Sequence, residues 1–125
     1  MGEDYEDEVL EVLGEAFSKT ANSGAMFDDA DLKHPEFVVE CKLRPLAAVS
    51  TSIPDVHLNQ LMRQAVKLNK DWIFVKKVTN DLSLAAVDLN MLSMLISERD
   101  HYKTECAELQ DRLDNAIGST YGSGD

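Results

Sequence analysis

The stretch from Asp31 to Lys42, DLKHPEFVVECK, constrains the fold more than any other part of this 125-residue chain. Pro35 indicates a turn, and the strand formers Phe-Val-Val follow it closely. Because side chains alternate along a strand, Glu40 and Lys42 point to one face, while Phe37, Val39 and Cys41 point to the other face, toward a core. The turn can carry Asp31 back over the charged face, so we expect two carboxylates and an ammonium group to meet there.

This group of residues suits metal-assisted cleavage of phosphodiester bonds. Mg²⁺ takes oxygen ligands, often from only one or two carboxylates, and keeps several waters. A bound metal polarises the phosphate and lowers the pKa of its water, while a lysine orients that water or stabilises charge on the phosphoryl oxygens. The pattern Asp-x8-Glu-x-Lys therefore predicts a metal site at Asp31 and Glu40 with Lys42 beside it. Asp28 and Asp29 are rivals of Asp31, and a surface hairpin with solvated charges is the alternative.

An amphipathic helix is predicted over residues 3–17. Its apolar stripe consists of Val9, Leu10, Leu13 and Phe17. Glu6 falls on the same stripe, which is unusual for an acidic side chain, and it is a candidate for the third metal ligand. Glu8 is the second choice, and the alternative is that Glu6 only stabilises the helix N-terminus through the helix dipole. A polar loop is expected over residues 18–25.

The remaining elements follow from periodicity and turn residues. We expect a helix over residues 54–69, a hairpin of strands 71–78 and 82–87, and a long helix from Asp88 to about Ala116, with Gly118 as its stop. The fold class is therefore α/β, with a mixed sheet flanked by helices. One domain is expected over residues 1–117, followed by a disordered Gly/Ser tail over residues 118–125.

The last helix forms an arm over about residues 89–117. Its apolar residues recur three or four apart, namely Leu92, Leu95, Ile96, Tyr102, Cys106, Leu109, Leu113 and Ile117. Arg99 and Lys103 interrupt the pattern. The stripe is longer than a small sheet can cover, so we expect it to pair with another copy or to pack across the domain.

The net charge of −11 weighs against binding to nucleic acid, but the charge is unevenly distributed. Residues 1–32 carry ten acidic residues and one basic residue, whereas residues 33–77 carry eight basic and four acidic residues. The basic part holds Glu40 and Lys42, so contact with phosphates is expected there, with weak and salt-sensitive binding.

The composition also bears on where the chain resides. There is no apolar run long enough for a transmembrane helix, and the acidic N-terminus lacks the features of a signal peptide. No contact with membrane is therefore expected. The two cysteines are expected to be reduced thiols in a cytoplasmic protein.

These residues resemble the PD-(D/E)XK nuclease superfamily, most of all its Holliday junction resolvases and the phage endonuclease group. Two stretches carry the resemblance: Asp31–Lys42, and the helix around Glu6 with the Asn-Ser-Gly-Ala loop after it. It covers roughly residues 5–88, and Ala30 stands where the family name has proline. The resemblance implies a restriction-endonuclease-like core, Mg²⁺ (with Mn²⁺ substituting) held by Glu6, Asp31 and Glu40, and Lys42 assisting the attacking water.

Contacts with DNA are expected from four further residues. Ser23 lies in the loop that, by the resemblance, sits beside the scissile phosphate, and Arg44 follows the Glu-x-Lys strand. Gln60 represents the glutamine that some relatives place in the site, with Gln64 as the alternative. Lys76 and Lys77 point to opposite faces of their strand, and Lys76 is taken as the one that approaches DNA.

The expected function is that of a Mg²⁺-dependent, structure-selective endonuclease that acts on branched DNA in recombination. A symmetric junction needs two cuts, which favours a homodimer. The resemblance further suggests a phage or mobile-element protein acting in a bacterial cytoplasm. The alternatives are another nuclease of the superfamily, which nicks or processes ends, and a non-catalytic dimeric α/β adaptor.

Overall fold

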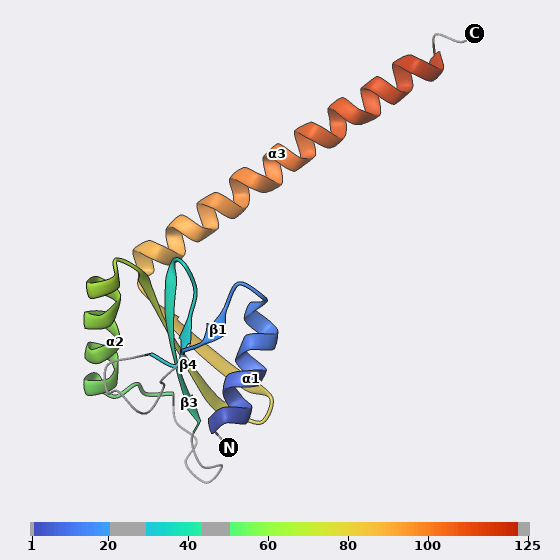
Figure 1. Ribbon diagram of the computed structural model, residues 1–125. Coiled ribbons are helices and arrows are strands. Elements are labelled where there is room, and N and C mark those ends of the chain that lie inside the picture. The colour runs from blue at the N-terminus through green and yellow to red at the C-terminus, as the bar shows by residue number, and fades with distance from the viewer. Residues whose placement is uncertain (1, 21–29, 44–50, 123–125) are drawn as a thin grey trace. The chain divides into compact units, whose positions relative to one another are not determined.

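The computed structural model describes residues 2–20, 30–43 and 51–122, and the chain divides into two units, residues 1–88 and 89–125. In the first unit, helices α1 (Gly2–Leu13) and α2 (Asp55–Leu68) cover opposite faces of a five-stranded sheet (Figure 1). The second unit is the single helix α3 (Leu89–Gly122). The predicted α/β class, with a mixed sheet between helices and a long C-terminal helix, is confirmed.

The sheet has the order β1-β2-β3-β4-β5. The strands are β1 (Ser18–Lys19), β2 (Leu32–Lys33), β3 (Phe37–Leu43), β4 (Asp71–Thr79) and β5 (Leu82–Val87). Strands β3 and β4 are parallel, and the other neighbouring strands are antiparallel. A parallel pair needs a long crossover connection, which α2 provides between β3 and β4.

Each face of the sheet has its own apolar core. Under α1 the buried residues are Tyr5, Val9, Leu32, Val39 and Val75. Under α2 they are Ala30, Val38, Leu61, Ala65 and Phe74. Because alternate residues of a strand point to opposite faces, the neighbours Val38 and Val39 enter different cores. Strand β3 is therefore held from both sides.

The first helix is shorter than predicted, and the segment after it is different. Gly14 has a φ of +105°, and its N–H donates to the carbonyl of Leu10, so the helix ends at Leu13. The chain then turns, and the Phe17 ring lies 4.4 Å from the ring of His34, between centroids. Residues 18–19 pair with β2 instead of belonging to a loop, a contact that their poor strand propensity did not indicate.

The later elements follow the prediction closely, with two corrections. Periodicity predicts that the buried stripe of α2 consists of Leu58, Leu61, Met62, Ala65 and Leu68, but Met62 and Leu68 are exposed while Leu61 and Ala65 are buried. Helix α3 runs through Gly118, the predicted stop, to Gly122. A glycine inside a helix costs only about 1 kcal/mol relative to alanine, which is too little to end a long helix. Among the described residues, no helix combines the length and the apolar character that crossing a bilayer requires.

Candidate active site on strand β3

Strand β3 places Glu40 and Lys42 on one face of the sheet. Val38 shares that face and packs in the core under α2, so both charged groups lie on the α2 side. The Lys42 Nζ is 3.4 Å from Glu40 Oε2, and the side chains of Lys42 and Glu40 are 34% and 22% exposed. The pair therefore lies at the end of a core strand with partial access to solvent.

The register of β2 and β3 brings Asp31 to the same place. Leu32 pairs with Val39 in antiparallel register, so the residues just outside that pair, Asp31 and Glu40, face each other. The Oδ2 of Asp31 accepts a hydrogen bond of 2.9 Å from the backbone N–H of Cys41. This bond holds the Asp31 carboxylate against β3, beside Glu40.

The surroundings of Glu40 perturb its carboxyl group. Burial, followed by the negative charge of Asp31, raises the pKa of Glu40 to about 7 from its ordinary value of 4.5, while Lys42 acts in the opposite direction. A hydrogen bond between the carboxyl groups of Glu40 and Asp31 adds to the rise. Near neutral pH Glu40 is therefore only partly ionised, and a bound cation would replace its proton. A carboxyl group perturbed in this way is typical of functional sites.

Cys41 lies between these residues but points to the α1 side, where it packs against the core. Burial raises the pKa of its thiol, and the charges of Asp31 and Glu6 raise it further. The thiol therefore stays protonated at neutral pH, and Cys41 is unsuited to act as a nucleophile. Cys41 and Cys106 are both free cysteines in this structure.

The structure distinguishes the two candidate glutamates of α1. Glu8 forms an ion pair with Lys77, whose Nζ is 3.1 Å from Oε2, and is engaged away from β3. Glu6 is half-buried, and its charge acts on Cys41, the neighbour of Glu40. Within the described ranges, however, no three His, Cys, Asp or Glu side chains form a group that could hold a metal ion. Asp31 and Glu40 are brought together as a pair, and Glu6 approaches from the other face of the sheet.

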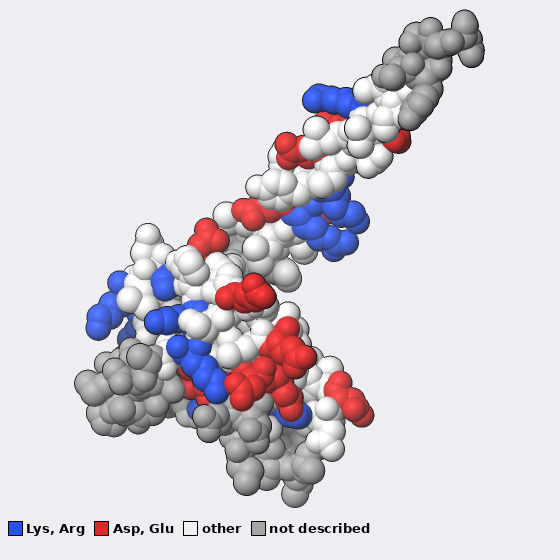
Figure 2. Space-filling model, turned by 45° about the vertical axis from the view of Figure 1, so that its right-hand side comes forward, with Lys and Arg blue, Asp and Glu red and all other residues white. Residues whose placement is uncertain are grey.

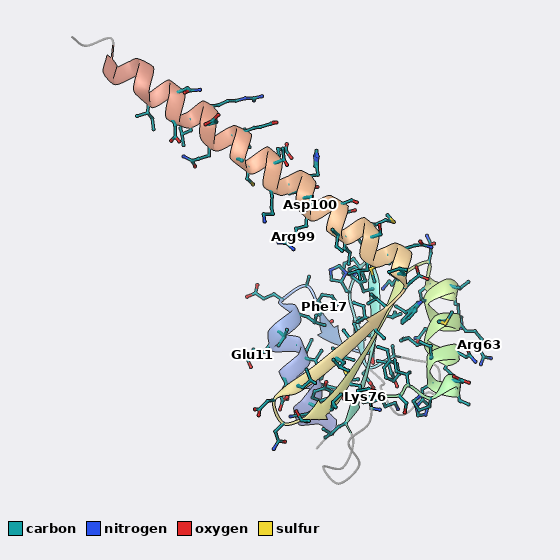
Figure 3. The ribbon with its side chains drawn as sticks, turned by 180° about the vertical axis from the view of Figure 1, so that it is seen from behind. Glu11, Phe17, Arg63, Lys76, Arg99 and Asp100 are labelled. Atoms are coloured by element: carbon teal, nitrogen blue, oxygen red, sulfur yellow. The ribbon has the colours of Figure 1, made fainter. Side chains whose placement is uncertain are left out.

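Lys76 is buried, with only 3% of its surface exposed. It pairs in register with Lys42 on the neighbouring strand and shares its face of the sheet. Its Nζ donates to the backbone carbonyl of Ser52, and Figure 3 shows the side chain between the sheet and α2, with Arg63 on the outer side of that helix. As placed, Lys76 is not presented to a ligand in solvent. Its role as a DNA contact stays a prediction.

The remaining predicted DNA contacts are a glutamine of α2, together with Ser23 and Arg44. Gln60 is exposed on α2, while Gln64 is half-buried beside the stripe that faces the sheet. Ser23 and Arg44, like the rival acids Asp28 and Asp29, lie outside the described residues.

Sequence reasoning missed the group of residues that anchors α1 to the sheet. The Tyr5 hydroxyl donates to Ser83 Oγ at 2.9 Å, and the Nζ of Lys77 lies 5.6 Å from the centre of the Tyr5 ring. A signal was available, because Tyr5 lies one turn before Val9 on the apolar stripe of the helix. These contacts fix the helix that carries Glu6.

Charge is divided across the first unit. Helix α1 carries six described acidic residues and no basic residue, whereas α2 and β4 together carry four described basic residues and two acidic residues. On the face shown in Figure 2, the acidic and basic side chains of this unit likewise lie toward different sides. The uneven distribution expected from the sequence is therefore also an uneven distribution in space.

Comparison of the chain with protein-family models, with curated proteins and with solved structures gave no match. The chemistry of Asp31, Glu40 and Lys42 is therefore the basis for inferring what the chain does.

Proposed function

We propose that this chain is a Mg²⁺-dependent, structure-selective DNA endonuclease that resembles the Holliday junction resolvases of the PD-(D/E)XK superfamily. The observation that carries the proposal is the carboxyl pair of Asp31 and Glu40, with Lys42 3.4 Å from Glu40 on the same face of β3. The order of helix, three strands, helix and parallel strand supports a restriction-endonuclease-like core.

The residues present fit a Mg²⁺ ion. Two carboxylates in a half-buried site, together with waters, are an ordinary set of ligands for this ion. The hydrogen bond from the Cys41 N–H fixes Asp31, and Glu40 must lose a proton whose pKa is about 7 before it can bind a cation. Metal affinity should therefore rise through neutral pH. Glu6 is proposed as a further carboxylate on the α1 side.

Each residue then has a role in hydrolysis. When bound, Mg²⁺ supplies charge that polarises the phosphodiester and lowers the pKa of water. Lys42 orients the attacking water or stabilises the charge that develops on the phosphoryl oxygens. Its ion pair with Glu40 keeps the ammonium group next to the carboxyl pair.

The proposed substrate is branched DNA in a bacterial cytoplasm, cut by a homodimer that can make two incisions. The basic segment 33–77 is the proposed contact surface, with Arg44 and Gln60 as assigned contacts within it and Ser23 as an assigned contact outside it. Because the whole chain carries a charge of −11, binding is expected to weaken steeply as salt is raised.

Cleavage assays test the proposal directly. A four-way junction, a linear duplex and a single strand are each incubated with the full chain in Mg²⁺, Mn²⁺ or EDTA. We expect junction cleavage in either metal, none in EDTA, and none with Asp31→Asn or Glu40→Gln. Asp71→Asn, which changes an exposed acid on the neighbouring strand, is the matched control and should cleave normally. Full activity of both site variants would show that the site is misassigned.

Thermal unfolding requires no DNA and distinguishes the proposed enzyme from a non-catalytic adaptor. A ligand that binds only the folded state raises its stability, so Mg²⁺ at pH 8 should raise the Tm of the wild-type chain. The rise should be absent in Asp31→Asn and present in Asp71→Asn. An adaptor whose acids only solubilise it would show the same small salt effect in all three proteins.

A further inference from the structure

Helix α3 exposes an unusually long series of apolar side chains. From Leu92 to Gly118 every side chain is exposed, including Leu109 and Leu113, which are each 54% exposed. In proteins, a helix gains most of its stability by packing an apolar face against another element. A helix of this length with an apolar stripe is therefore expected to pack against a partner.

The apolar residues of α3 follow a seven-residue repeat. Its a positions hold Leu92, Arg99, Cys106 and Leu113. Its d positions hold Leu95, Tyr102, Leu109 and Ala116. The f positions on the opposite side hold Ser97, Thr104 and Asp111. A repeat of alternating three- and four-residue steps, kept over nearly four heptads, is the pattern of a left-handed coiled coil.

We infer that α3 pairs with α3 of a second copy of this chain, as a parallel, in-register, two-stranded coiled coil. In that arrangement Glu98 at a g position lies opposite the partner's Lys103 at an e position, and each copy contributes one such pair. Arg99 is the one charged residue among the a positions; it meets the partner's Arg99 across the interface, and the partner's Glu98 flanks it and offsets that like charge. A single polar a position favours a defined register, because shifting the helices would bury the charge against apolar residues.

The antiparallel alternative fits these charges less well. If the a positions of one helix pair with the d positions of an antiparallel partner, Glu105 lies against the partner's Glu105 and Lys103 lies against the partner's Lys103. It gains contacts between Glu98 and the partner's Arg112. The like-charge contacts at the centre of the overlap nevertheless disfavour this orientation.

Oligomeric state tests the pairing, and needs neither DNA nor metal, so it is independent of the proposed nuclease activity. Sedimentation of the full chain at micromolar concentration should give a dimer. Leu109→Asp should give a monomer, because a C₂ interface contains the same residue from both copies and therefore contains the substitution twice. Thr104→Asp, an added acid on the outer side of the same helix, should remain a dimer. A wild-type monomer, as expected if the stripe packs within its own chain, would overturn the inference.

Cross-linking tests the orientation. In a Cys106→Ser background, Leu113→Cys places one thiol at an a position that meets itself only in a parallel, in-register pair. An antiparallel pair on the same stripe separates the two thiols by about 27 Å, from eighteen residues at the helical rise. Copper-phenanthroline oxidation in air should therefore produce a disulfide-linked dimer of this variant, but not of Cys106→Ser alone or with Ser97→Cys added. A dimer that fails to cross-link through position 113 would refute the parallel arrangement.

Discussion

The two units of the chain differ in where their apolar side chains go. In residues 1–88, Leu32 and Val39 are fully buried, and each face of the sheet has a core completed by a helix of the same unit. In α3, the described side chains from Leu92 to Gly118 are all exposed. The first unit therefore has cores of its own, although some of its apolar side chains, such as Val12 and Val66, are exposed, whereas the stripe of α3 is suited to a surface from elsewhere.

Charged groups show the same contrast. The pair of Lys42 and Glu40 is half-buried, and the negative charge of a third group, Asp31, acts on Glu40. On α3, His101 and Glu105 form an i,i+4 contact of 3.6 Å with both side chains mostly exposed. Exposed pairs of this kind contribute only a few tenths of a kcal/mol, so the charges of α3 are better suited to choosing a partner than to stabilising the helix.

The largest expected effect is on core stability. Leu32→Ala should lower the free energy of unfolding by about 2–5 kcal/mol, because it leaves a cavity in a fully buried position. Leu109→Ala, measured at a concentration low enough to keep the chain monomeric, should change it by about 0.5 kcal/mol or less. Urea denaturation of both variants measures the contrast. Equal losses would mean that α3 belongs to the same core.

The next effect concerns catalysis. Lys42→Ala should slow junction cleavage on the order of 10²–10³-fold while junction binding is kept, since a transition-state interaction is lost. Lys103→Ala on α3 is the matched control and should leave the rate of the first nick unchanged. Gel-shift and cleavage assays on the same junction provide both quantities. Equal loss of binding and cleavage in Lys42→Ala would make Lys42 a phosphate anchor rather than a catalytic residue.

A third effect is the pH dependence of stability without metal. The folded state raises the pKa of Glu40 from 4.5 to about 7, so between these values the folded state holds a proton that the unfolded chain has lost. Stability should therefore fall as pH rises through this window, by on the order of 3 kcal/mol at most, and then level off. Glu40→Gln should remove the fall and be the more stable protein at pH 8. Unfolding in EDTA across pH 4 to 8 measures it, and parallel curves for the two proteins would contradict it.

The smallest expected effect contrasts two glycines. Gly118 lies inside α3 with no atom within 4 Å of an added Cβ, so Gly118→Ala should stabilise the helix by about 0.5–1 kcal/mol. Gly14→Ala has equal space, but a φ of +105° makes the substitution strained and destabilising by roughly 1 kcal/mol or more. Helicity by circular dichroism and urea midpoints should move in opposite directions for the two variants.

Local sequence determined much of this protein. Strand formers, turn residues and apolar periodicity predicted β3, β4, β5 and α2, because each depends on residues close in the chain. Alternation along a strand likewise placed Glu40 and Lys42 on one face, and a regular repeat predicted α3, although its end at Gly122 was missed.

Only the tertiary structure decided which distant groups meet. The register of Leu32 with Val39 brings Asp31 to Glu40, and the packing of α1 leaves Glu8 on Lys77 while Glu6 acts on Cys41. Burial of Lys76 likewise depends on α2 covering its face of the sheet. Periodicity fixes the direction of a side chain relative to its own backbone. Strand register, burial and the resulting pKa depend on segments far along the chain, which no local pattern encodes.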